Sequence, residues 1–119
     1  MNNSESEIYS SAINSYKSGD YQCAVAGFGI VLSKEPLSGQ AGFLLGLSRL
    51  ALENYSLAIS LLSDVANGSG EYAKEAKWYL GLSYLKTNNP LKAQECFEYL
   101  ARSDGFYRER SEKILRRLK

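Results

Sequence analysis

The sequence predicts an all-α fold: a right-handed solenoid of three stacked helix pairs closed by a C-terminal helix, seven helices in all. The main observation is a phrase that occurs three times with a small residue in the same place, Ala24, Ala58 and Ala93, at intervals of 34 and 35 residues. The second is a large apolar residue four positions after each alanine, on the same helix face. A period of this length is typical of stacked helix-turn-helix units.

The helices are expected at residues 6–17, 21–33, 38–52, 55–67, 71–86, 90–102 and 106–119. Gly19 supplies the turn of the first pair, and Pro36 ends the second helix because proline lacks the N–H that a helix needs. The second pair follows, and the glycine- and serine-rich stretch 67–70 ends it. Pro90 suits the first position of the sixth helix, and turn residues 103–105 precede the seventh. These short connections leave no room for a strand.

The helices group into a single domain, with repeats at 5–36, 37–70 and 71–104 and a capping helix at 105–119. Each pair carries another small residue, twelve positions before the alanine, where the helix axes are expected to approach closely: Ala12, Gly46 and Gly81. The large residues after the alanines are expected to fill the space between neighbouring pairs: Phe28, Leu62 and Phe97. Truncating any of them to alanine should cost about 2 to 5 kcal/mol of stability.

Composition excludes several classes of function. The chain of 119 residues has a net charge of +1, so no strong global field recruits nucleic acid or an anionic membrane. It has no apolar run long enough to span a bilayer, and its N-terminus lacks the features of a secretory signal. We therefore expect a cytoplasmic protein, unless the sequence has been excised from a larger exported or membrane-anchored one.

Reactive side chains are scarce. The chain contains no histidine, which removes the commonest general base and metal ligand. Cys23 and Cys96 fall in different repeats, on the second helices of the first and third, and both are expected to be reduced and partly buried. The carboxylates show no convergent pair suited to acid–base work. The sequence thus predicts no enzyme activity, no catalytic residue, no metal and no cofactor.

The combined pattern resembles the tetratricopeptide repeat family over residues 5–102. The matching positions are Gly19-Asp20-Tyr21, Ala24, Phe28 and Pro36 in the first repeat, Leu45-Gly46, Tyr55, Ala58 and Leu62 in the second, and Trp78, Leu80-Gly81, Tyr84, Ala93 and Phe97 in the third. Three positions depart from the pattern: Trp78 lies one residue late, Arg49 takes a tyrosine position, and Pro90 replaces the turn tyrosine. The block from Trp78 to Leu115 also looks like the last repeat and capping helix of small bacterial members.

The resemblance places function on the inner, concave face, which the family builds from the first helix of each repeat. Three residues of each first helix, spaced by four and three, are expected to bind a partner: Tyr9, Ile13, Tyr16, Phe43, Leu47, Leu50, Trp78, Leu82 and Leu85. An exposed apolar patch of this kind usually marks an interaction site. Only Lys17 and Lys86 could form a carboxylate clamp there, which favours an apolar or amphipathic protein segment as the ligand.

Other interpretations of the same residues stay open. The aromatic side chains could serve only to pack neighbouring repeats together, or the same face could meet a second copy of the chain. The segment 106–119 is basic and could bind nucleic acid or anionic lipid, although Tyr107, Ile114, Leu115 and Leu118 suit a capping helix better. Arg49 is expected to pair with a nearby acid such as Asp64, because an unpaired buried charge is costly.

Overall fold

The structure of the chain, a computed structural model, describes residues 3–118. Over this range the regular structure is helical and contains no strand. The helices are α1 (Asn3–Ser18), α2 (Tyr21–Lys34), α3 (Gly39–Ala51), α4 (Tyr55–Ala66), α5 (Ala73–Lys86), α6 (Pro90–Ala101) and α7 (Tyr107–Leu118). The prediction of seven helices is confirmed for this range, although α1 begins three residues earlier than expected. The predicted last helical residue, Lys119, lies outside the described residues.

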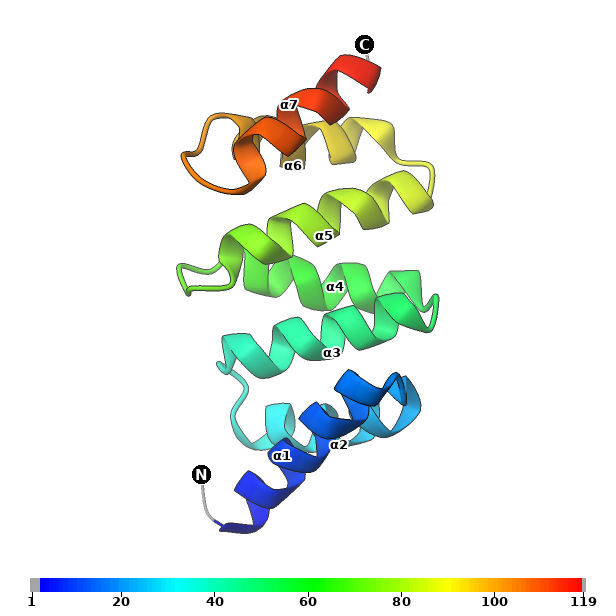
Figure 1. Cartoon of the computed structure of the whole chain (residues 1–119), viewed down its shortest axis with the longest axis vertical. Coiled ribbons are helices and arrows are strands. Elements are labelled where there is room, and N and C mark those ends of the chain that lie inside the picture. Colours follow the sequence, from blue (N-terminus) through cyan, green and yellow to red (C-terminus); the bar gives the residue numbers. More distant parts are fainter. Residues whose placement is uncertain (1–2, 119) are drawn as a thin grey trace.

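The helices stack in chain order along one axis. Each helix packs against the helix before it and the helix after it, and α3 also contacts α5 directly. The stack measures 49 × 26 × 21 Å, with α1 and α7 toward opposite ends of the long axis (Figure 1). The molecule is therefore a quasi-linear array in which each unit depends on its neighbours for a core.

The turn inside each pair has the same geometry in all three repeats. Gly19, Glu53 and Asn88 have positive φ angles of 85°, 61° and 61°, as expected for the residue that ends a helix in a Schellman motif. The N–H of each bonds to the carbonyl three residues before it, and the next residue's N–H bonds to the carbonyl five residues before that residue. Only the first repeat places glycine at this left-handed position; asparagine in the third repeat also tolerates it, whereas Glu53 in the second carries backbone strain.

Side-chain caps begin two of the helices. Asp20 accepts a hydrogen bond from the backbone N–H of Cys23 at 3.2 Å, and Ser38 accepts one from Ala41 at 3.2 Å. Pro90 begins α6, as predicted, and the side chain of Asn89, which precedes it, makes no capping bond. Proline at the first helical position has no N–H to satisfy, so this helix start tolerates a weaker cap.

Close approach of paired helices explains the recurring small residues. Ala24, Ala58 and Ala93 are fully buried, as are the large residues four positions later. A Cβ added to Gly46 would lie 2.8 Å from Leu62 Cδ2, and one added to Gly81 would lie 2.7 Å from Phe97 Cζ. The predicted close packing at these two glycines is confirmed.

Two expectations about single side chains are wrong. Cys23 is exposed, because it lies in the first turn of α2 beside its cap residue Asp20, whereas Cys96 is buried as predicted. Arg49 donates a hydrogen bond to Asn54 Oδ1 at 3.2 Å, whereas the predicted partner Asp64 is exposed on α4. The Arg49 side chain is only half-buried, so its charge does not require a carboxylate.

Candidate functional site

The nine predicted binding residues lie on α1, α3 and α5, whose shared side we call the inner face. They form three rows, each with one residue per helix. The junction row contains Tyr9, Phe43 and Trp78, and the two groove rows contain Ile13, Leu47 and Leu82, and Tyr16, Leu50 and Leu85. The rows follow the helical spacing of four and three, so each helix repeats the same stripe.

The junction row joins consecutive repeats. Phe43 is only 7% exposed and stacks on Tyr72, the residue just before α5, with ring centroids 5.3 Å apart. Trp78 repeats this contact one unit later, stacking on Tyr107 at 5.3 Å while its edge meets Phe97. Phe43 and Trp78 therefore hold neighbouring units together, and the Phe43 side chain is core and not free surface.

The first junction is built differently. Leu37, Tyr72 and Tyr107 each lie four residues before a fully buried small residue, yet Leu37 is 98% exposed and stacks on no ring. Tyr9 instead meets the edge of Phe28 and donates a hydrogen bond to Gln40 Oε1. Burial, followed by the electrostatic influence of Tyr72 and Glu35, raises the pKa of Tyr9 to about 12.

The groove rows are half-buried rather than freely exposed. All six side chains pack at the edges of the three core clusters, and each is half-buried. The expectation of a fully exposed apolar stripe is therefore corrected, because each of these side chains is partly covered by the core cluster against which it packs. Each groove residue keeps part of its surface exposed to solvent, and Lys17 and Lys86, near the ends of α1 and α5, are exposed as well.

Tyrosines that the sequence interpretation did not assign also contribute to the inner face. Tyr79 on α5 contacts Phe43 at a centroid distance of 6.0 Å, and Tyr21 meets Tyr16 edge-on at 5.7 Å. Burial raises the pKa of Tyr16, with smaller contributions from Tyr21 and Tyr79. The hydroxyl groups of these tyrosines can donate hydrogen bonds, which makes the face amphipathic. Their pattern could be recognised only once the helices were placed.

The helix α7 acts as a cap. Its apolar side packs on the cluster around Phe97 and Leu100, and the contributing side chains are Tyr107, Ile114, Leu115 and Leu118. Arg108 pairs with Asp104 at 3.3 Å and with Glu112 at 3.4 Å, so part of the basic charge is compensated within the segment. The Ser111 hydroxyl is fully buried without a hydrogen-bond partner, which is an unfavourable arrangement for a polar group.

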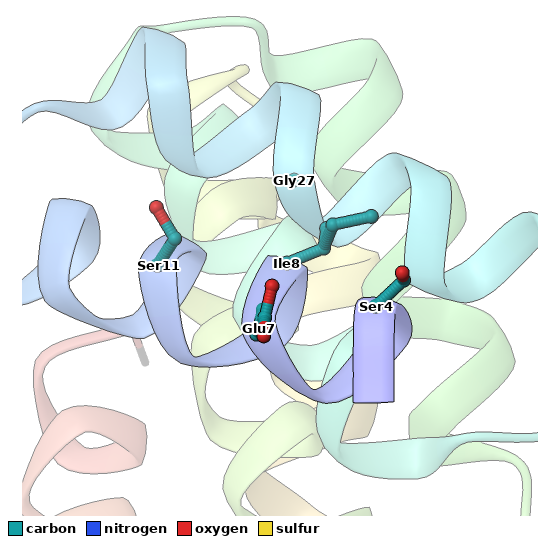
Figure 2. A pocket seen from close by; sticks show the side chains of 5 residues that line it. All are labelled: Ser4, Glu7, Ile8, Ser11 and Gly27. Carbon is teal, nitrogen blue, oxygen red and sulfur yellow. The ribbon is translucent and has the colours of Figure 1, made fainter. Parts of the chain in front are cut away.

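The opposite end of the stack carries a shallow cleft of about 390 Å³, shown in Figure 2. Ser4, Glu7, Ile8 and Ser11 of α1 line it beside Gly27 of α2. The corresponding side of α3 carries Ala41 and packs on the preceding repeat, whereas Glu7 and Ser11 are exposed. A polar outer side is what a terminal repeat needs.

Large apolar side chains are more exposed away from the inner face. Besides Leu37, they lie on the second helices and before the cap: Ile30, Leu57, Leu91, Tyr99 and Phe106. Within residues 3–118, no three His, Cys, Asp or Glu side chains come together as metal ligands. Over the same range, no helix combines the length and the apolar character that crossing a bilayer requires.

No family model matches the sequence, and no curated protein matches it either. Solved structures do match. The type III secretion chaperone SycD of Yersinia enterocolitica, in complex with a peptide of the translocator YopD, superposes with a TM-score of 0.85 at 21% identity, covering 99% of this chain and 94% of that one. SycD in an alternative dimer gives 0.82 at 21% identity, covering 99% and 93%.

A third match is the CopN-Scc3 complex, with a TM-score of 0.81 at 24% identity, covering 97% of this chain and 69% of that chain. The SycD neighbours are type III secretion chaperones, and their folds are helical repeats of the tetratricopeptide type. The predicted all-α solenoid of three such repeats with a capping helix is thereby confirmed. At these identities the similarity establishes the fold alone.

Proposed function

We propose that this protein is a small, non-enzymatic member of the tetratricopeptide repeat family that holds an apolar or amphipathic segment of a partner protein against its inner face. The groove rows are the contact surface, with Ile13, Leu47 and Leu82 at its centre. The junction row supports this surface by fixing the spacing of α1, α3 and α5.

The observation that carries the proposal is the triple repetition of half-buried apolar side chains on adjacent first helices. Each side chain is already ordered by its core cluster, so a ligand that covers it loses little further side-chain entropy. Tyrosine hydroxyls at the border of these rows supply hydrogen bonds to a bound backbone. A helix or extended segment laid across the rows would bury apolar area at each repeat.

The neighbours support the same interpretation. One of them is described as a chaperone in complex with a peptide of a translocator, and this chain covers nearly all of it. A chaperone that holds an apolar segment needs binding and no chemistry, which agrees with the absence of histidine from the sequence. By analogy, this chain would bind a segment of a partner protein in the cytoplasm.

The test compares two faces with matched substitutions. Leu47→Ser and Leu82→Ser together would remove the centre of the groove rows, while Leu57→Ser and Leu91→Ser would change the exposed leucines of α4 and α6. Tagged forms expressed in the source organism would be purified and their partners identified by mass spectrometry. We expect the partner to be lost from the first variant and kept by the second. Equal recovery by both variants, with circular dichroism unchanged, would contradict the proposal.

Self-association through the same rows is a second candidate, supported by the dimeric form in which a neighbour occurs. Light scattering coupled to size-exclusion chromatography separates the two. A dimer that dissociates when Leu47 and Leu82 become serine would favour self-association. A monomer at concentrations up to the high micromolar range would leave the inner face for a different protein.

A further inference from the structure

A cleft of about 560 Å³ opens at the edge of the stack, between the α2–α3 connection and the α4–α5 connection. Its walls include Leu61 and Val65, its mouth carries the exposed Leu37, and the carboxylate of Asp64 lies at its side. The lining contains no lysine or arginine and none of the nine predicted binding residues. The cleft is therefore separate from the groove rows.

The repeat pattern explains why the cleft exists. In the third repeat, Lys74 in the first turn of α5 donates a hydrogen bond to the backbone oxygen of Asp104 at 3.1 Å, which ties the helix to the connection after α6. In the first repeat, Glu5 of α1 pairs with Lys34 at the end of α2 at 3.9 Å. The corresponding residue of the second repeat is Gly39, which has no side chain to make such a tie. The middle unit alone among the described repeats is left open at this position.

A neighbouring position repeats the contrast. Lys77 of α5 places its ammonium group 4.8 Å from the centre of the Tyr99 ring. At the corresponding positions, 35 residues earlier, the second repeat carries Gly42 and Asp64. Asp64 makes no ion pair within residues 3–118, so its carboxylate is available beside the cleft. Compared with the third repeat, the cleft lacks both lysine side chains and carries a carboxylate, Asp64, where the third repeat has Tyr99.

The equivalent cleft of the third repeat is smaller, about 150 Å³, and its lining includes Lys74 and Asp104. In that cleft, the ammonium group of Lys74 reaches a backbone oxygen of the connection that follows the second helix. The corresponding oxygen in the open cleft belongs to Ser69, which also lines it. If a lysine side chain entered this cleft with its aliphatic stem along Leu61 and Val65, its ammonium group would lie near Asp64.

We infer that this cleft binds a lysine side chain of a protein partner, with an adjacent apolar side chain of that partner packing on Leu37. Lys74 and Lys77 of the third repeat show where lysine side chains lie at the equivalent place, and the Asp64 carboxylate supplies the complementary negative charge. The site would add a basic-plus-apolar contact at the edge of the stack, and it does not depend on what the inner face holds.

The probe is a capped tripeptide, acetyl-Ala-Lys-Leu-amide, titrated into the ¹⁵N-labelled protein and followed by amide chemical shifts. The matched control replaces lysine by norleucine, which keeps the stem and removes the charge. We expect saturable shifts at Gly42, Gly68 and Gly70, with an affinity about fivefold weaker for the norleucine peptide. Shifts confined to the groove rows would overturn the inference while leaving the proposed function intact, and so would equal affinity for the two peptides.

Two variants sharpen the test. Asp64→Asn removes an exposed charge and should weaken the lysine peptide about threefold without altering the norleucine peptide. Gly39→Lys restores the side chain that the third repeat has at this position, and nothing lies within 4 Å of the added Cβ. This variant should fill the cleft and abolish the shifts. Because lysine favours helix over glycine, the variant should remain folded. Undiminished binding to a folded Gly39→Lys protein would overturn the inference.

Discussion

Phe43 and Leu47 lie one helical turn apart on α3, and their surroundings differ. Phe43 is covered by Tyr72 and Tyr79 of the next repeat, whereas Leu47 packs only at the edge of the same core cluster. The difference shows that one apolar stripe contains two kinds of position. Residues of α3 that lie level with the start of α5, such as Phe43, pack between repeats. Residues one turn further along α3, such as Leu47, are left for a ligand.

The same comparison separates the first junction from the later two. An aromatic pair closes the second junction with Phe43 and the third with Trp78, while at the first Tyr9 bonds to Gln40 and Leu37 points to solvent. The first repeat is therefore attached with fewer ring contacts. The cleft that contains no lysine lies beside the α2–α3 connection, which joins the first repeat to the second.

The largest expected effect concerns the junction row. Phe43→Ala should lower the free energy of unfolding by about 3 to 5 kcal/mol, because it removes a buried ring and the stacking contact of that ring with Tyr72. Leu47→Ala should cost about 1 to 2 kcal/mol, since its side chain is only half-buried. Urea unfolding followed by circular dichroism measures both. Equal losses would contradict the division into junction and groove rows.

The second prediction concerns the cap. Ser111→Ala should raise the free energy of unfolding by about 1 to 2 kcal/mol, because it removes a buried hydroxyl that has no partner. Ser83→Ala is the matched control. Ser83 is equally buried, but its hydroxyl donates to the Tyr79 carbonyl at 2.7 Å, so its removal should bring no gain. If Ser83→Ala stabilises the protein, or if Ser111→Ala leaves its stability unchanged, the Ser111 hydroxyl does not carry the cost of an unsatisfied buried group.

The third prediction uses the repeated turn. Glu53→Gly should stabilise the protein by about 0.5 to 1 kcal/mol, because glycine adopts the positive φ of this turn without a steric penalty. Gly19→Ala, at the equivalent position of the first repeat, should destabilise it. Thermal unfolding of both variants gives the answer, and changes of the same sign would show that the three turns are not equivalent.

The smallest effect is a pH dependence at the first junction. The pKa of Tyr9 is raised to about 12 in the folded state and is near 10 in the unfolded chain, so the unfolded state loses its proton first. The stability that Tyr9 contributes is complete below pH 10 and is lost as the pH rises toward 12. Tyr9→Phe should flatten this part of the stability curve. An identical decline in the variant would assign the effect to other groups.

Much of the fold could be predicted from the sequence, because the small residues that let helices approach recur with the period of the repeat. Gly46 and Gly81 are examples, and their close contacts are those expected. The role of Phe43 could not be predicted, since its coverage depends on Tyr72, which lies in a connection whose path the sequence does not specify. The exposure of Leu37 escaped prediction for the same reason.

The central claim is that the groove rows, and not the outer leucines, contact the partner. A photo-crosslinking residue, p-benzoylphenylalanine, placed at Leu82 or at Leu57 in the source organism tests it directly. The account predicts a crosslinked partner from position 82 and none from position 57. Crosslinking from position 57 alone, or equally from both, would contradict it.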